Sequence, residues 1–150
     1  MLRITQEADN ALRLVLLLAK SGERTDAPTL AQRAGIAPQF ALKILRKLKQ
    51  EKLVQTVKGA HGGYLLAEPP AALTVLRVVE TIDGPLYINR CLENGFVCSR
   101  MGVHTERCVV NQLFARVNQS VAEQLAAVTF ADLLARDAKV PTVCRDEEDA

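Results

Sequence analysis

The sequence contains no apolar run long enough to cross a membrane. The longest is the segment LVLLLA at residues 14–19, whereas a membrane-spanning helix needs about 20 apolar residues. The first residues, MLRITQEADNALR, also lack the small-residue cleavage site of a secretory signal peptide. We therefore expect a cytoplasmic protein that has no membrane partner.

Cysteine is scarce as well, with 4 residues in a chain of 150. That number is too small for a disulfide scaffold, and a reducing compartment disfavours disulfides. The short C-x2–4-C pair that is typical of zinc sites is absent. This absence argues against a zinc-stabilised adaptor module.

Few residues are available for catalysis. The sequence has two histidines, His61 and His104, and it shows neither a nucleophile–base pairing nor a phosphate-binding glycine loop. The glycine-rich segment at residues 59–63 (GAHGG) lies between two predicted strands and matches neither phosphate-binding pattern. We predict that the protein is not an enzyme.

The composition is that of a globular chain, with 49% hydrophobic and 24% charged residues. Charge is distributed unevenly. Residues 1–68 contain 11 Lys and Arg against 6 Asp and Glu, and residues 69–150 contain 8 against 11. A basic first half and an acidic second half indicate that the first half contacts a polyanion.

The first half has the pattern of a winged helix-turn-helix. Apolar periodicity predicts helices over residues 4–20, 29–34 and 38–52, and strands over residues 53–57 and 64–66. Gly35 ends the second predicted helix, and Pro38 suits the first position of the third. Two helices joined by a glycine-containing turn, followed by a hairpin with a basic tip, make this motif.

The second half contains a helix over residues 73–82, a loop over 86–107, a long helix from Cys108 and a short helix capped by Thr129. The long helix has an apolar stripe that a compact winged helix leaves uncovered, and a second copy of the chain is the simplest cover. We predict a mainly α fold: a winged helix-turn-helix domain at residues 1–68, a connecting helix and cysteine-bearing loop at 69–107, and a dimerisation helix, short helix and acidic tail at 108–150.

The third predicted helix and the wing carry the candidate DNA contacts. Residues 43–58 include six Lys and Arg residues and one acid, Glu51. Gln39 and Lys43, near the helix start, are placed to reach base edges, whereas the later cations are placed for phosphates. The alternative is a solvated helix face. The predicted DNA-binding residues are Pro38, Gln39, Lys43, Arg46, Lys47, Lys49, Lys58 and His61.

Three cysteines, Cys91, Cys98 and Cys108, fall within one short stretch. A loop with spread thiolates can hold an iron–sulfur cluster, and a carboxylate or a histidine would then supply the fourth ligand. The alternative is three ordinary thiols.

At the level of whole segments, the chain resembles the bacterial winged-helix regulators typified by the iron–sulfur cluster regulator IscR, the nitric-oxide-sensing repressor NsrR and the rhizobial iron regulator RirA. The resemblance covers roughly residues 2–137, and the wing sequence KGAHGGYLLA is its most specific part. It rests on the segments LRITQEADNALRLV, TLAQRAGIAPQFALKILRKLKQEKLVQTVKGAHGGYLLAEP, LTVLRVVETIDGP and FADLL.

The resemblance implies a homodimeric, DNA-binding transcriptional regulator whose loop cysteines ligate an iron–sulfur cluster. Carried over in order, the ligands are Cys91, Cys98 and Cys108. The histidine that follows the last cysteine in IscR-like proteins is Asn111 here, whereas the acidic fourth ligand of NsrR-like proteins, supplied by the other subunit, corresponds to Asp9. The bland alternative for Asp9 is an i, i+4 pair with Arg13.

Other features of the site stay open at this level. Glu7 and His104 are lesser candidates for the fourth ligand, and Cys144 is expected to be a free thiol. The gap between Cys98 and Cys108 is longer than usual in the family, which leaves the cluster type, 2Fe–2S or 4Fe–4S, undecided.

The sequence therefore predicts a regulator, a repressor of a palindromic operator, that senses redox, nitric oxide or iron status through an iron–sulfur cluster. The alternative is a repressor of the same fold without a cluster, which senses thiol oxidation or a metabolite.

Overall fold

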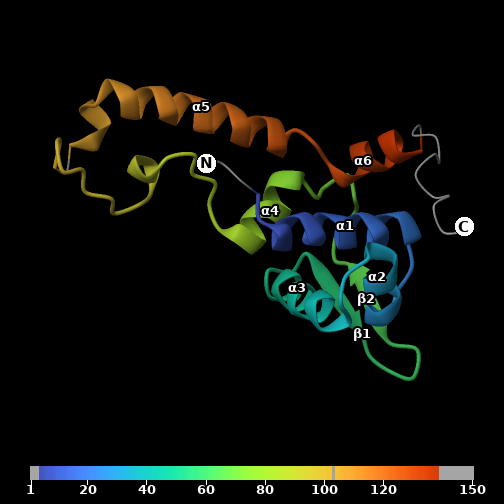
Figure 1. Cartoon of the computed structure of the whole chain (residues 1–150). Coiled ribbons are helices and arrows are strands. Elements are labelled where there is room, and N and C mark those ends of the chain that lie inside the picture. Colours follow the sequence, from blue (N-terminus) through green and yellow to red (C-terminus); the bar gives the residue numbers. More distant parts are fainter. Residues whose placement is uncertain (1–3, 103, 139–150) are drawn as a thin grey trace, which may run out of the picture.

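The computed structural model describes residues 4–102 and 104–138 and has the predicted mainly α-helical winged fold (Figure 1). The predicted acidic tail, with Cys144, lies outside the described residues. The elements in chain order are α1 (Gln6–Ser21), α2 (Ala27–Ala34), α3 (Pro38–Gln50), β1 (Val54–Val57), β2 (Gly63–Leu66), α4 (Val75–Asp83), α5 (Val109–Ala126) and α6 (Phe130–Asp137), with 3₁₀ turns at Arg90–Leu92 and Thr105–Arg107.

Helix α1 lies in the middle of the molecule. The Thr5 hydroxyl caps it by accepting a hydrogen bond from the Ala8 backbone N–H at 3.1 Å. Helices α2, α3, α4 and α6 and strand β2 all pack against α1. Its buried residues are therefore spread around the helix: Ala8, Asn10, Ala11, Leu14, Val15, Leu18 and Ala19.

The helix-turn-helix is formed by α2 and α3. Asp26 caps α2, since its carboxylate accepts from the Thr29 N–H at 2.9 Å, so α2 begins at Ala27, before the predicted residue 29. Gly35 ends α2 with φ of 67°, a left-handed conformation that favours glycine. The buried stripe of α3 consists of Ala41, Ile44, Leu45 and Leu48.

Strands β1 and β2 form the antiparallel wing, with Val54 opposite Leu66 and Val57 opposite Gly63. Thr25, just before α2, extends this sheet by exchanging two backbone hydrogen bonds with Tyr64, at 2.9 and 3.0 Å. A Cβ atom at Gly63 would lie 2.8 Å from the Thr25 carbonyl oxygen. A glycine is required there because the two backbones approach so closely.

Helix α4 begins after Thr74, so Leu73, which the sequence pattern placed inside the helix, lies before it and is fully buried. At the other end of α4, the Asp83 carboxylate accepts hydrogen bonds from the backbone N–H and the hydroxyl of Thr5, at 3.1 and 2.5 Å. The C-terminal end of α4 is thus tied to the start of α1.

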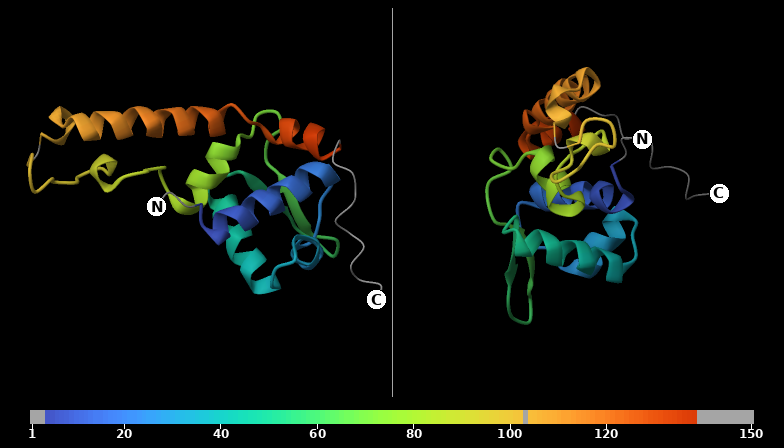
Figure 2. Two further views of the ribbon diagram at one scale, coloured as in Figure 1. Left: turned by 45° about the horizontal axis from the view of Figure 1, so that its top comes forward. Right: turned by 90° about the vertical axis from the view of Figure 1, so that its left-hand side faces the viewer.

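Helix α5 and the loop before it form an arm that extends away from the winged helix (Figures 1 and 2). The chain returns to the core in α6, where Phe130 is fully buried and its N–H donates to the Leu73 carbonyl at 3.0 Å. Lys20 at the end of α1 pairs with Asp137 at the end of α6, at 2.8 Å. Residues 1–68 therefore share one core with α4 and α6.

Replacing Phe130 with alanine is expected to lower the free energy of unfolding by about 3–5 kcal/mol, because the cavity lies in the shared core. Val97→Ala is the control, since Val97 is 62% exposed and its truncation is expected to cost about 0.5 kcal/mol or less. Urea unfolding followed by circular dichroism measures both values. Equal stabilities of the two variants would contradict a core that includes α6.

Candidate nucleic-acid interface and cysteine loop

The predicted DNA contacts lie on α3 and on the loop between β1 and β2. Their side chains are exposed, apart from Lys47, which is half-buried. Figure 1 shows α3 and the wing on the opposite side of α1 from α5 and α6. The two elements that carry the predicted contacts therefore lie on one side of α1, and these residues on them are exposed: Pro38, Gln39, Lys43, Arg46, Lys49, Lys58 and His61.

Two of the α3 lysines are paired with an acid on α1. Glu7 lies 2.7 Å from the Lys47 ammonium and 3.2 Å from the Lys43 ammonium. The nearby Lys47 ammonium holds the pKa of the Glu7 carboxyl below its ordinary value, and Lys43 adds to this effect, although partial burial opposes it. The sequence analysis missed this cluster because the three residues come from two helices, where helical spacing gives no signal.

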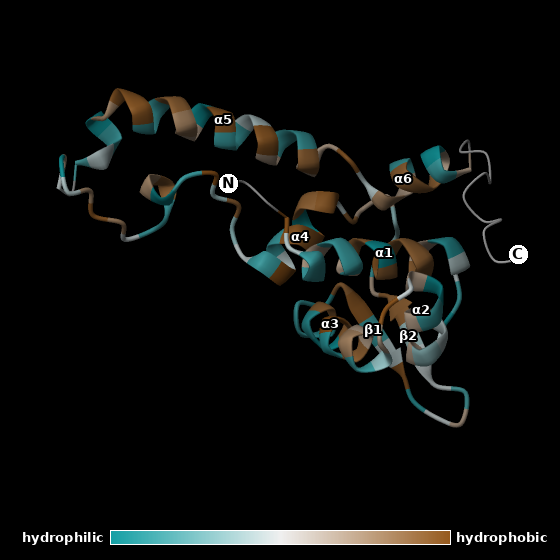
Figure 3. Cartoon of the chain, viewed as in Figure 1, coloured by the Kyte–Doolittle hydropathy of each residue, from teal (hydrophilic) through white to brown (hydrophobic). Residues whose placement is uncertain are grey.

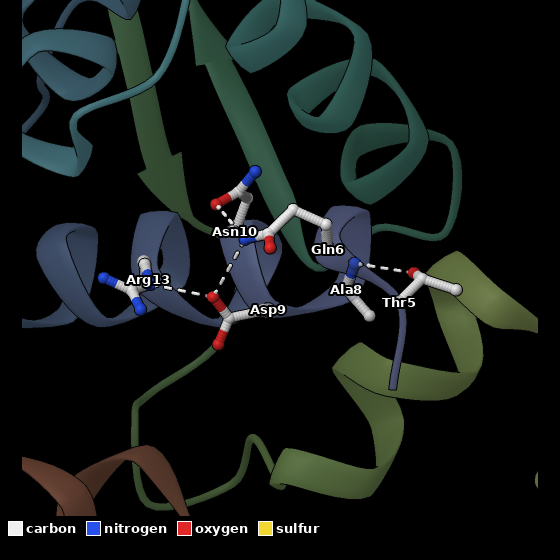
Figure 4. Close-up of polar contacts among 6 residues, drawn as sticks. All are labelled: Thr5, Gln6, Ala8, Asp9, Asn10 and Arg13. Carbon is white, nitrogen blue, oxygen red and sulfur yellow. Dashed lines mark hydrogen bonds and ion pairs between the residues drawn. The ribbon is translucent and has the colours of Figure 1, made fainter. Parts of the chain in front are cut away.

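Asp9 pairs with Arg13 on the same helix. The carboxylate lies 3.0 Å from the Arg13 Nε and also accepts a hydrogen bond from the Gln6 amide at 3.3 Å (Figure 4). The Asp9 side chain is 45% exposed, and Figure 4 shows it directed away from the two strands. Within one chain, Asp9 therefore forms the i, i+4 pair that the sequence left as its alternative.

The three loop cysteines are half-buried free thiols. Cys91 lies in the first 3₁₀ turn, Cys98 pairs with Gly102 in a tight bridge, and Cys108 directly precedes α5. An exposed arginine lies within two residues of each thiol, and these arginines are Arg90, Arg100 and Arg107.

Cys98 differs from the other two thiols because backbone N–H groups are directed at its sulfur. The backbone N–H of Arg100 donates to its sulfur at 3.4 Å. The N–H groups of Arg100 and Met101 hold the pKa of the Cys98 thiol below its ordinary value. Cys98 is therefore suited to act as a thiolate, whether as a metal ligand or as a reactive thiol.

Two asparagines of α5 hold the start of the cysteine loop. The Asn111 side-chain amide donates to the Cys91 carbonyl at 2.9 Å, and the Asn118 side-chain oxygen accepts from the Ile88 N–H at 3.0 Å. Asn111 is the one buried residue that the structure describes on α5. The position that carries a histidine in IscR-like proteins thus fixes the loop backbone here.

The loop cysteines are not gathered around a common point. Across residues 4–102 and 104–138, no three His, Cys, Asp or Glu side chains lie close enough to share a metal ion. The type of donor still suits an iron–sulfur cluster, because such clusters are held by cysteine thiolates and the loop supplies three cysteines. His104, the lesser candidate, lies 3.4 Å from Glu106.

In the part of the chain that the structure describes, no helix is both long and apolar enough to cross a bilayer.

Comparison with known proteins gives a consistent result. The family model Rrf2, described as an iron-dependent transcriptional regulator, matches residues 4–136. The Rrf2-like HTH-type transcriptional regulator of Rhodobacter capsulatus is 31% identical over 139 residues, which cover 88% of this chain and 92% of the relative.

Solved structures agree with this match. CymR, the global cysteine regulator of Bacillus subtilis, has a TM-score of 0.73 and 25% identity, covering 91% of this chain and 98% of CymR. IscR of T. potens has a TM-score of 0.72 and 22% identity, covering 93% of both chains. The match spans the winged helix, the cysteine loop, α5 and α6, and the relatives are named as transcriptional regulators and not as enzymes. The chain therefore belongs to the Rrf2 family of winged-helix, DNA-binding transcriptional regulators.

Proposed function

We propose that this regulator is a homodimeric repressor that binds a palindromic operator through α3 and the wing and responds to redox, nitric oxide or iron status through its loop cysteines. Residues 1–68 bind DNA in this proposal, residues 69–107 carry the sensor, and residues 108–150 form the dimer. The observation that carries the proposal is the position of three arginine-flanked thiols in the loop that joins α4 to α5.

The geometry of α3 supports major-groove binding. Its buried stripe fixes the helix on the core, so the opposite side is free to enter a groove. Pro38 and Gln39 begin the helix, where base edges come within reach, whereas Arg46, Lys47 and Lys49 lie further along and suit phosphates. Lys58 and His61 on the wing loop are placed for the neighbouring backbone.

Replacing Arg46 with glutamine is expected to weaken binding to any duplex and to reduce the slope of log K against log salt by about 0.9, because one phosphate contact is lost. Arg136→Gln is the control. It removes the same charge from an exposed position on α6 and should leave the slope unchanged. Fluorescence anisotropy over a salt series gives both slopes. An Arg46 variant with the wild-type slope would contradict a DNA-binding α3.

The outer side of α5 supports dimer formation. Its 18 residues make a helix about 27 Å long, on which Val109, Val110, Leu113 and Val117 are 43–76% exposed. Figure 3 shows brown, hydrophobic segments along this arm. A row of large apolar side chains in water is typical of a protein–protein interface, and a second copy of α5 would cover it symmetrically.

Leu113→Asp is expected to raise the dimer dissociation constant by about 100-fold or more, because it places a carboxylate in the middle of the apolar row. Gln119→Asp adds the same charge on α5 outside that row and should leave the dimer intact. Sedimentation equilibrium of both variants and the wild type distinguishes these results. A dimer of unchanged strength in Leu113→Asp would exclude this side of α5 as the interface.

For the sensor, we propose that Cys91, Cys98 and Cys108 hold a 2Fe–2S or 4Fe–4S cluster, with Asp9 of the second subunit as the fourth ligand. Such a cluster supplies an iron centre that nitric oxide or oxygen can modify. The Cys98 N–H contacts favour the thiolate form that ligation needs. Asn111 fixes the Cys91 backbone on α5, so a change in the loop is transmitted to the dimer helix.

A second candidate is a thiol sensor of the same fold without a cluster. It is favoured by the separation of the three thiols within the described chain and by the polarised, half-buried Cys98. Oxidation of such a thiol to a sulfenic acid or a disulfide would then be the signal.

Wild-type protein purified without oxygen is expected to be coloured and to contain iron and acid-labile sulfide. The variant Cys98→Ser is expected to lose at least about 90% of the iron, because one of the three thiolate ligands is removed. Cys144→Ser is the matched control and should retain iron and colour. Visible absorption with iron and sulfide assays measures this. A colourless, iron-free wild type that still binds DNA would exclude the cluster and leave the thiol sensor.

A further inference from the structure

Glu7 occupies an unusual place among the residues near the DNA-binding side. It lies in the first turn of α1, yet its carboxylate reaches across to α3, where it contacts Lys43 and Lys47. Its side chain is 20% exposed, whereas those of Lys43 and Lys47 are 56% and 36% exposed. The acid is therefore the less solvated partner of both ion pairs.

The two carboxylate oxygens are not equivalent. Oε2 accepts a hydrogen bond from Lys43 at 3.2 Å. Oε1 is buried, makes no aligned hydrogen bond with any group that the structure describes, and has the Lys47 ammonium 2.7 Å away as its ion-pair partner. If Lys47 turned toward a phosphate, Oε1 would lose its countercharge while buried, and that loss is unfavourable.

Lys43 is restrained a second time. Its ammonium lies 5.7 Å from the centre of the Phe40 ring, within the range of a cation–π contact. Two of the cations that the sequence assigns to DNA are thus already bound within the protein. Arg46 and Lys49 have no ion pair with any side chain that the structure describes.

We propose that Glu7 is a specificity-determining residue that competes with DNA phosphate for Lys43 and Lys47 and so lowers the affinity of the regulator for non-specific DNA. The inference rests on the proposed role of α3 as the DNA-contacting helix. Non-specific binding depends on the number of phosphates that are neutralised. On DNA of arbitrary sequence, Lys43 has no matching base edge and counts, with Lys47, as a cation that neutralises phosphate. An internal carboxylate that occupies these two cations therefore weakens non-specific binding, whereas base contacts from Gln39 are unaffected.

The test is the binding of a duplex of arbitrary sequence to Glu7→Gln, measured by fluorescence anisotropy over a salt series. The amide keeps the shape of the side chain and removes its charge. We expect affinity to rise about fivefold at low salt and the slope of log K against log salt to steepen by up to about 1.8, since each of two freed lysines contributes about 0.9. Glu51→Gln is the control. It removes a carboxylate at the end of α3 that forms no ion pair with any described side chain, so it reports the general effect of removing one negative charge.

The same substitution in a Lys43→Gln, Lys47→Gln background separates competition from a change in folding. Glu7→Gln is expected to have no effect there, because the lysines it frees are absent. An effect of Glu7→Gln no larger than that of Glu51→Gln, or one that persists without the lysines, would overturn the proposal. If Arg46→Gln, which removes a cation that Glu7 does not hold, leaves the salt slope at the wild-type value, α3 is not the DNA-contacting helix, and the proposed function fails first.

Discussion

Helix α1 has apolar side chains around most of its circumference, so it is stable in water only when other elements cover it on several sides. Four helices and strand β2 supply that cover. Leu14 and Val15 lie at the centre of this packing with no exposed surface. The burial of α1 therefore sets the positions of α3, of the wing, and of α4 and α6, between which the arm lies in the chain.

The first turn of α1 then joins the functional parts of the molecule. Thr5 bonds the end of α4, from which the cysteine loop begins, and Glu7 holds two lysines of α3. Asp9, the proposed cluster ligand, lies on the same turn. Its side chain is partly exposed and pairs with Arg13. A contact made to this turn by a second subunit would act on α3 through a single rigid element, which is what a two-state switch requires.

Much of this arrangement could be predicted from the sequence because its signals are local. Helical periodicity, Gly35 and the Gly62–Gly63 pair marked the helix-turn-helix and the wing. Element ends were less accurate, as at Asp26 and Thr74, because side-chain capping decides them. The Glu7 cluster and the Asn111 tether were missed, since each joins segments whose proximity depends on tertiary packing. The clustering of the three cysteines in the sequence raised an iron–sulfur cluster as one interpretation, and the family resemblance assigned them as ligands and added Asp9.

The central claim is that the state of the loop cysteines sets the affinity of α3 for DNA. The most direct measurement is the affinity of the dimer for its operator, determined on one anaerobic preparation before and after exposure to nitric oxide. The reference is a variant in which the three loop cysteines are replaced by serine. We expect the affinity to change by about tenfold or more, a coupling of about 1.4 kcal/mol, and the reference protein not to respond. Equal affinities before and after exposure would contradict a sensor in this loop.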